Sequence, residues 1–339
     1  MAPSPSRKCS ASAPSAPTLP DDEDVFERIR SGCRHVADRA AHVRIDVNRL
    51  DAYVDEYETE PLGQRVEPMH EPLGDDEATA AFVVTHDAVN FGSGWHPVLR
   101  KRPGCSGSMT ILATLRERAE RDGPLSAVEL AGLTPAACAD LLSQDPNGPA
   151  GDLMALFARS LNDLGCVVRD EHGGSFAALV ESAGGSAARL VHVLQRMPTY
   201  TDTWGYDGIE VPLLKRAQIT VHDLALAFGG QRLGAFADID RLTIFADNLV
   251  PHVLRLDGVL TYDDHLVRRI EAGVLLDAGS REEVEIRSVA VHAVELLAAR
   301  VRDTGGTRTP RDIDEILWRR GGAPEYKAVP RHRCRTTAY

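Results

Sequence analysis

Apolar residues recur along most of the chain at the three- and four-residue spacing of amphipathic helices, and strict alternation is rare. Behind the acidic start at Asp22, this spacing predicts a helix as far as Ala41. The same pattern predicts further helices over 78–91, 108–121, 151–164, 175–183 and 186–196, with two short helices between 125 and 142. The sequence therefore predicts a mainly α-helical fold with few short strands.

Gly and Pro residues mark where the next helices end or break. The helix that begins at Lys215 is expected to stop at the glycine pair 229–230. A strongly apolar helix is expected over 242–256, broken by Pro251. Short alternating stretches, compatible with minor strands, occupy 42–45 and 165–169.

Two capping patterns place the last helices. Ser280, followed three residues later by Glu283, is a capping box that opens the longest helix. Thr309 and Pro310 supply a cap and a first helical residue for the final one. No sequence repeat of solenoid length interrupts this series, so we predict a single large helical domain.

Composition indicates the cellular location and the limits of the domain. The chain has 339 residues, 43% of them hydrophobic, and can bury a large core. Residues 1–20 are rich in Ala, Ser and Pro, so we expect a disordered tail before a domain over 21–339. No segment approaches the roughly 18 apolar residues of a membrane span. Six scattered cysteines favour reduced thiols and a cytoplasmic location over a zinc site or a disulfide framework.

The net charge of −12 argues against a broad phosphate-binding face. Duplex DNA and tRNA are therefore poor partners, because their affinity comes mainly from basic residues. A small anionic ligand remains possible, since one or two cations suffice to bind it.

Charged side chains in otherwise apolar helices mark the candidate site. Lys215, Gln218 and His222 share one helix face. The lysine either extends its stem toward solvent or contributes to a ligand pocket with its two polar neighbours. Three polar groups on one stripe favour the pocket.

Two later segments carry buried charge as well. Asp247 follows Phe245 in an apolar stretch, either as a satisfied cap near Pro251 or as a carboxylate tuned by an apolar pocket. Glu285 and Arg287 form either a structural ion pair or part of the same polar pocket.

Two loops add binding candidates. Asn90 and Phe91 lead into a glycine-rich turn that suits a ligand, whereas His70 is either an ordinary loop histidine or a weak binding candidate. Tyr200 and Asp202 lie in an aromatic, acidic loop that is either an ordinary turn or a stacking platform for a planar ring. The chain has no phosphate loop, HExxH, GxSxG or dinucleotide-binding fingerprint.

Six motifs resemble, in order and roughly in spacing, those of the queuosine salvage protein family. They are Asp87-x-x-Asn90-Phe91, Tyr200-x-Asp202, Lys215-Arg216-Ala217-Gln218, Phe245-Ala246-Asp247-x-x-x-Pro251, Glu283-Val284-Glu285-Ile286-Arg287 and Pro330-x-His332-Arg333. The resemblance implies a fold like that of helical DNA glycosylases. It also implies an N-glycosylase that releases queuine from queuosine 5′-phosphate with no cofactor and no metal.

This reaction breaks an N-glycosidic bond through a transition state that resembles an oxocarbenium ion. Asp247 is expected to stabilise or attack that cation, and Asp314 is the second catalytic candidate. Asp202 and Glu285 are candidates for hydrogen bonds to the base, with Phe245 among the stacking residues. The full set of substrate-binding candidates is His70, Asn90, Phe91, Tyr200, Asp202, Lys215, Phe245, Glu285 and Arg287.

Two other functions compete with this one. A non-catalytic module that binds a nucleotide or base would keep the stacking residues without a poised Asp247. A nucleic-acid base glycosylase would share the helical fold, but the negative charge argues against it. We expect the partner to be a free nucleotide, with no direct nucleic-acid contact and no membrane.

Overall fold

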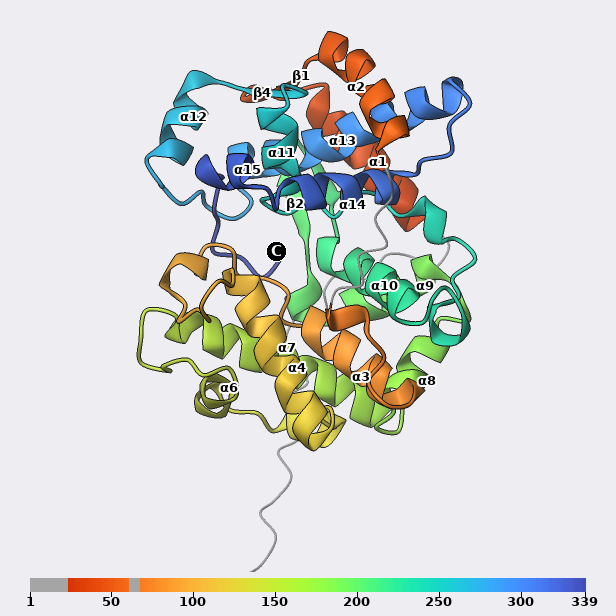
Figure 1. Ribbon diagram of the computed structural model, residues 1–339, viewed down its shortest axis with the longest axis vertical. Coiled ribbons are helices and arrows are strands. Elements are labelled where there is room, and N and C mark those ends of the chain that lie inside the picture. Colours follow the sequence, from red (N-terminus) through yellow and green to blue (C-terminus); the bar gives the residue numbers. More distant parts are fainter. Residues whose placement is uncertain (1–23, 61–67) are drawn as a thin grey trace, which may run out of the picture.

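Helices form most of the protein that the computed structural model describes, residues 24–60 and 68–339 (Figure 1). The α-helices are α1 (Val25–Ala37), α2 (Val47–Thr59), α3 (Asp76–Asp87), α4 (Gly107–Asp122), α5 (Ala127–Ala131), α6 (Pro135–Leu141), α7 (Gly151–Glu171), α8 (Phe176–Glu181), α9 (Ala187–Gln195), α10 (Lys215–Ala227), α11 (Val250–Leu256), α12 (Asp264–Glu271), α13 (Arg281–Asp303), α14 (Pro310–Arg320) and α15 (Pro324–Ala328). Short 3₁₀ helices are η1 (Pro68–His70), η2 (His96–Val98), η3 (Pro198–Tyr200), η4 (Arg232–Gly234) and η5 (Ile239–Arg241). The strands are β1 (Val43–Ile45), β2 (Thr203–Tyr206), β3 (Ile209–Pro212) and β4 (Leu260–Tyr262).

The predicted mainly α-helical fold is confirmed. Each helix expected from periodicity over 22–41, 78–91, 108–196 and 215–228 has a counterpart. Polar side chains cap most helix starts by accepting a backbone N–H, as Thr309 does for α14. The expected tail at 1–20 lies outside the described residues.

Two local predictions were wrong. The stretch 165–169 is not a strand but lies inside α7, where Gly165 lets the helix approach α5. A Cβ at this glycine would lie 2.3 Å from the Ala131 nitrogen, so only glycine fits the crossing. The apolar stretch 242–256 is helical only from Val250, and Pro251 lies in the first turn of α11, where proline is tolerated.

The capping box predicted at Ser280 is half formed. Its hydroxyl accepts the Glu283 N–H at 3.3 Å. The Glu283 carboxylate, however, accepts from Gly279 N at 3.1 Å and pairs with Arg287 instead of closing on the capping residue.

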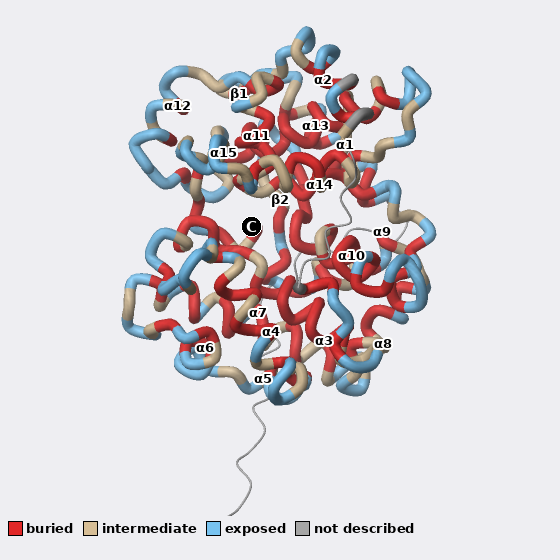
Figure 2. The backbone as a smooth tube through the Cα atoms, in the orientation of Figure 1, coloured by how far each residue is buried: buried red, intermediate tan, exposed pale blue. Residues whose placement is uncertain are grey.

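The helices lie in two groups (Figure 1). In one group α13 packs against α1 and α2, and in the other α7 packs against α5 and α6 while α10 packs against α3 and α9. Figure 2 shows buried segments running through the interior of both groups, and a continuous hydrophobic core joins them. The long α13 contributes fourteen buried residues to this interior, which explains its apolar run.

Two small antiparallel sheets complete the fold. β1 pairs with β4 with Arg44 opposite Thr261, which confirms the strand expected at 42–45. β2 and β3 form a hairpin in the loop expected to be aromatic and acidic. Its turn residues Asp207 and Gly208 have φ of 44° and 87°, the positive values that a two-residue type I′ turn requires. The hairpin returns the chain beside Asp202, whose carbonyl accepts the Leu213 N–H at 2.9 Å.

Cysteine chemistry differs from the prediction at one position. Cys33, Cys105, Cys138 and Cys334 carry free thiols. Cys166 is disulfide-bonded, so the expectation of reduced thiols was wrong there. Within the described ranges, every helix is too short or too polar to cross a bilayer.

Candidate active site

A cavity of about 840 Å³ is lined by residues from both helical groups. η1, the segment from α3 to α4, and α10 contribute from one group. The segment before α11, α14 and the C-terminal segment contribute from the other. The volume lies in the range of small-molecule sites.

The predicted catalytic pair, Asp247 and Asp314, lies in this cavity. Asp314 is only 5% exposed, and its Oδ1 accepts the Phe245 N–H at 2.8 Å. Burial, aided by the negative charge of Asp247, raises the pKa of Asp314 to about 8. Asp314 is therefore a neutral carboxylic acid near pH 7.

Asp247 is held differently. Its Oδ1 accepts the N–H groups of Leu249 at 2.6 Å and Val250 at 3.1 Å, so this oxygen caps the start of α11. Its Oδ2 makes no hydrogen bond to any described residue. The interpretation of Asp247 as a cap near Pro251 is therefore confirmed, and its role toward a ligand stays a prediction.

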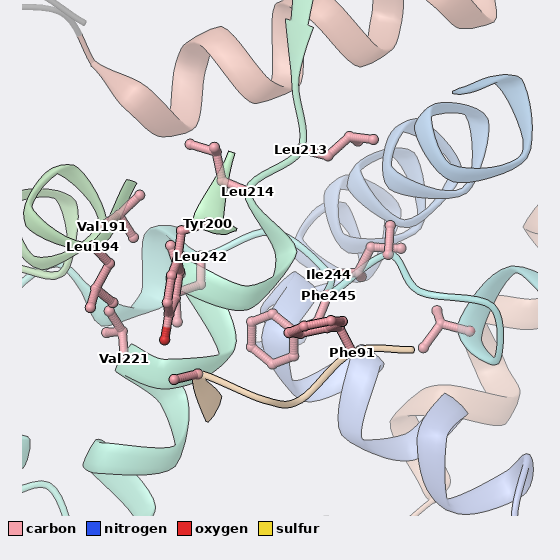
Figure 3. Packing of buried hydrophobic residues seen from close by; sticks show 14 of the residues in the cluster. Phe91, Val191, Leu194, Tyr200, Leu213, Leu214, Val221, Leu242, Ile244 and Phe245 are labelled. Atoms are coloured by element: carbon pink, nitrogen blue, oxygen red, sulfur yellow. The ribbon is translucent and has the colours of Figure 1, made fainter. Parts of the chain in front are cut away.

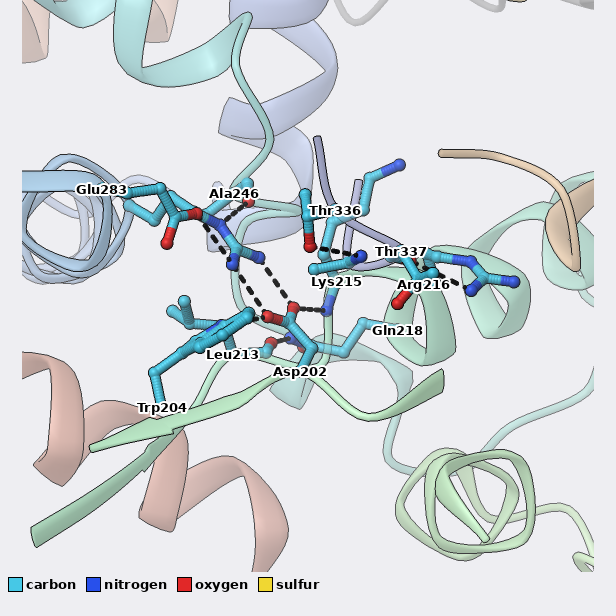
Figure 4. Close-up of polar contacts among 12 residues, drawn as sticks. Asp202, Trp204, Leu213, Lys215, Arg216, Gln218, Ala246, Glu283, Thr336 and Thr337 are labelled. Carbon is cyan, nitrogen blue, oxygen red and sulfur yellow. Dashed lines mark hydrogen bonds and ion pairs between the residues drawn. The ribbon is translucent and has the colours of Figure 1, made fainter. Parts of the chain in front are cut away.

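Lys215 reaches the cavity through an unusual start to α10. Leu214 precedes it in the left-handed conformation, φ 50°. The Lys215 N–H donates to Asp202 Oδ2 at 3.0 Å (Figure 4). Burial lowers the pKa of the Lys215 ammonium, and the negative charges of Asp247 and Asp223 oppose that effect.

Asp202 and Arg287 form a buried ion pair beside the site. The Arg287 guanidinium donates two hydrogen bonds to the Asp202 carboxylate, at 2.8 and 2.7 Å, and a third to the carbonyl of Ala246 at 2.8 Å. Neither residue lines the cavity, so their prediction as direct substrate contacts is corrected. They fix the backbone on both sides, at Lys215 and beside Asp247.

Glu285 and Tyr200 are also placed away from the cavity. Glu285 is fully buried and accepts from three successive backbone N–H groups at Ala41, His42 and Val43, and from Tyr206. It therefore binds the start of β1, and the predicted contact with the base is corrected.

Tyr200 packs against a buried cation. The Arg216 guanidinium carbon lies 4.2 Å from the Tyr200 ring centroid and 4.6 Å from that of Phe91. Figure 3 shows Tyr200 among the buried side chains around α10. The predicted stacking of Tyr200 on the base is therefore corrected, because its ring is occupied within the core.

The remaining predicted binding residues do line the cavity: His70, Asn90, Phe91, Lys215 and Phe245. The Phe245 ring centroid lies 5.2 Å from that of His222, so the two form an aromatic wall. Burial lowers the pKa of His222 to about 3, which keeps this ring neutral. A neutral aromatic wall suits a planar heterocycle.

Three further charged or polar residues line the cavity although no motif predicted them. Two of them are Arg331 and His96. Arg331 has no ion-pair partner among residues 24–60 and 68–339. The run of basic residues near the C-terminus is the sequence feature that could have predicted its role. Burial and the nearby charges of Arg331 and Lys215 lower the pKa of His96 to about 4.

The third is Asp223, which follows His222 on α10. Its Oδ1 pairs with His70 Nε2 at 3.1 Å. Only the tertiary fold brings these two residues together, because 153 positions separate them. No group of His, Cys, Asp and Glu within the described ranges has the arrangement of a metal site.

Comparison with known proteins gives one consistent result. A family model described as queuosine salvage protein matches residues 70–339. A Sphaerobacter thermophilus protein named queuosine 5′-phosphate N-glycosylase/hydrolase is 34% identical over 315 residues, covering 90% of this chain and 96% of that protein. Proteins of the same name from Mus musculus and Bos taurus are 30% and 31% identical, covering 91% and 79% of this chain and 98% and 84% of theirs. The family match includes Asp247 and Asp314.

Proposed function

The chain belongs to the queuosine salvage protein family, and on this premise we propose that it hydrolyses queuosine 5′-phosphate to queuine and ribose 5-phosphate. The observation that carries the proposal is a pair of cavity aspartates in different surroundings. Asp247 has an oxygen without a protein partner among the described residues, whereas burial raises the pKa of Asp314 to about 8. One carboxylate and one carboxylic acid are what glycosidic hydrolysis uses.

The proposed reaction begins with the bond between C1′ and the base nitrogen. As that bond lengthens, positive charge develops on the sugar, and Asp247 stabilises it through its unbonded oxygen. The departing base takes the electron pair. Asp314 gives the base a proton from the oxygen that does not accept the Phe245 N–H. A water molecule then adds to C1′ and gives a proton to the Asp314 carboxylate, which leaves ribose 5-phosphate and restores the acid.

The cavity has groups for both ends of the nucleotide. Lys215, Arg331 and His96 line the same region, where the nearby cations lower the pKa of His96. We assign these basic residues to the 5′-phosphate, because one anion satisfies both cations. Phe245 and His222 provide the wall for the base.

The proposal covers the whole domain over 21–339, a cytoplasmic location and a free mononucleotide as substrate. α1 lies before the residues that the family model matches, and it packs on α13 within the same core. The net charge of −12 disfavours an intact polynucleotide.

Incubation of the protein with queuosine 5′-phosphate, followed by mass spectrometry for queuine and ribose 5-phosphate, tests the proposal. Equimolar formation of both products is expected. Binding without products would instead support a non-catalytic module. Release of base from full-length modified tRNA at a rate comparable to that from the mononucleotide would support a nucleic-acid glycosylase.

A further inference from the structure

The cavity contains an acidic group that the proposed reaction does not use. Asp223, on α10, lines the cavity and is 3% exposed. Its Oδ1 pairs with His70 Nε2 at 3.1 Å. Its Oδ2 is buried and has no hydrogen-bond partner among residues 24–60 and 68–339.

A second buried carboxylate lies behind the first. Asp87, at the end of α3, is fully buried, and its Oδ1 contacts His86 Nδ1 at 3.2 Å. Its Oδ2 also lacks a partner among the described residues. Burial and the charge of Asp87 together raise the pKa of Asp223 to about 6.

Two buried carboxylates with unpaired oxygens are unfavourable unless a cation joins them. Lys215 is close enough for these carboxylates to act on its pKa, but no ion pair within 4.0 Å links it to either of them. Arg311, another cation of the lining, pairs with Asp240 and Asp312. The cavity therefore has a place for a cation supplied by the ligand.

The neighbours of Asp223 indicate which part of the ligand supplies that cation. Asp223 directly follows His222 on α10, and the His222 ring centroid lies 5.2 Å from that of Phe245, in the aromatic wall that we assign to the base. The cation therefore belongs to the base. In queuosine 5′-phosphate the base has a secondary amine on its 7-substituent that is protonated near neutral pH.

We propose that Asp223, oriented by His70 and backed by Asp87, binds the protonated amine of the 7-substituent and makes the enzyme selective for aminated 7-deazaguanine nucleotides. This inference rests on the proposed function. The charge of the 7-substituent then decides which bases are accepted. A base with a neutral 7-substituent leaves Asp223 Oδ2 buried and unpaired, which weakens binding.

Three 5′-monophosphates test the inference: queuosine, 7-aminomethyl-7-deazaguanosine and 7-cyano-7-deazaguanosine. The second keeps the cation without the cyclopentene ring, and the third keeps the heterocycle without the cation. We expect Asp223→Asn to lower kcat/KM about 10- to 100-fold for the two aminated substrates, since hydrogen bonds to charged groups have this magnitude. For the cyano substrate, kcat/KM should change by no more than about threefold, which is less than the loss of one hydrogen bond to a charged group would cause.

Asp163→Asn is the matched control, because Asp163 is a partly buried aspartate on α7 that does not line the cavity. It should leave all three values unchanged. An equal loss on all three substrates with Asp223→Asn would overturn the inference and make Asp223 a structural residue.

Binding of free bases separates this inference from the proposed function. If the wild-type protein releases no base from any nucleotide, the proposed function fails, and calorimetry with queuine and 7-cyano-7-deazaguanine still tests the subsite. Wild-type protein should bind queuine at least about tenfold more tightly than the cyano base, as one charged hydrogen bond requires. Equal affinities would refute the subsite. This measurement uses only wild-type protein, so it decides the question even if the Asp223→Asn variant fails to fold.

Discussion

Asp314→Asn isolates the titration of one buried carboxyl group. The substitution preserves shape and leaves an oxygen that can accept the Phe245 N–H, but it removes the ionisable proton. In the folded protein burial raises the pKa of Asp314 from its ordinary value of 3.8 to about 8. The unfolded chain has the ordinary value, so the folded state holds this proton more tightly.

The sign and size of the effect follow from proton linkage. Because the folded-state pKa is the higher one, the wild type has its full stability below about pH 4 and loses stability as pH rises to about 8. Each pH unit in this window corresponds to about 1.4 kcal/mol. Between pH 5 and pH 8 the wild type should therefore lose about 4 kcal/mol of unfolding free energy relative to Asp314→Asn.

Urea unfolding of both proteins at pH 5, 6, 7 and 8 measures this difference. Other groups that titrate in the window, Asp223 among them, are present in both proteins and largely cancel. We also expect wild-type kcat/KM to fall above about pH 8, as Asp314 loses the proton that it donates. A stability difference that stays constant across the four pH values would refute both the neutral carboxyl group and its role as the acid.

Three further predictions concern the phosphate end, the support behind the site and the helix crossing. Arg331→Met and Lys215→Met should raise KM for the 5′-monophosphate much more than for the nucleoside in steady-state assays, and an equal loss on both would remove these residues from the phosphate site. Arg287→Met should destabilise the protein by about 3–5 kcal/mol in urea unfolding, because it leaves the Asp202 carboxylate buried without its partner. A loss below about 1 kcal/mol, which is typical of an exposed ion pair, would contradict that role. Gly165→Ala should lower stability by more than about 1 kcal/mol through a clash with α5, which an unchanged Tm would contradict.

Much of the fold was predictable because helix periodicity and caps are local. The spacing of apolar residues and polar caps such as Ser280 and Thr309 located the helices within a few residues. The prediction was wrong over 242–249 because an apolar stretch looks alike in a buried helix and in a buried loop. The distinction depends on Asp247 capping α11, a contact that appears only in three dimensions.

The candidate site was predictable in part for the same reason. Asp247, Asp314 and Lys215 came from motifs and lie in one cavity. Asp202 and Glu285 were predicted to contact the base, but each is held by protein groups distant in sequence. Asp202 bonds Arg287 across 85 positions, and Glu285 bonds Val43 across 242. A sequence shows that a charge is buried and does not show which partner neutralises it.

In the proposed reaction Asp247 stabilises the developing charge on the sugar. Single-turnover release of queuine from queuosine 5′-phosphate by wild-type protein and Asp247→Asn tests it, with queuine affinity measured alongside. The variant keeps the cap on α11 through its side-chain oxygen. We predict a rate about two to three orders of magnitude lower, with queuine affinity nearly unchanged. A variant that retains more than about a tenth of the wild-type rate would contradict the account, because removing one such stabilising group costs far more than that.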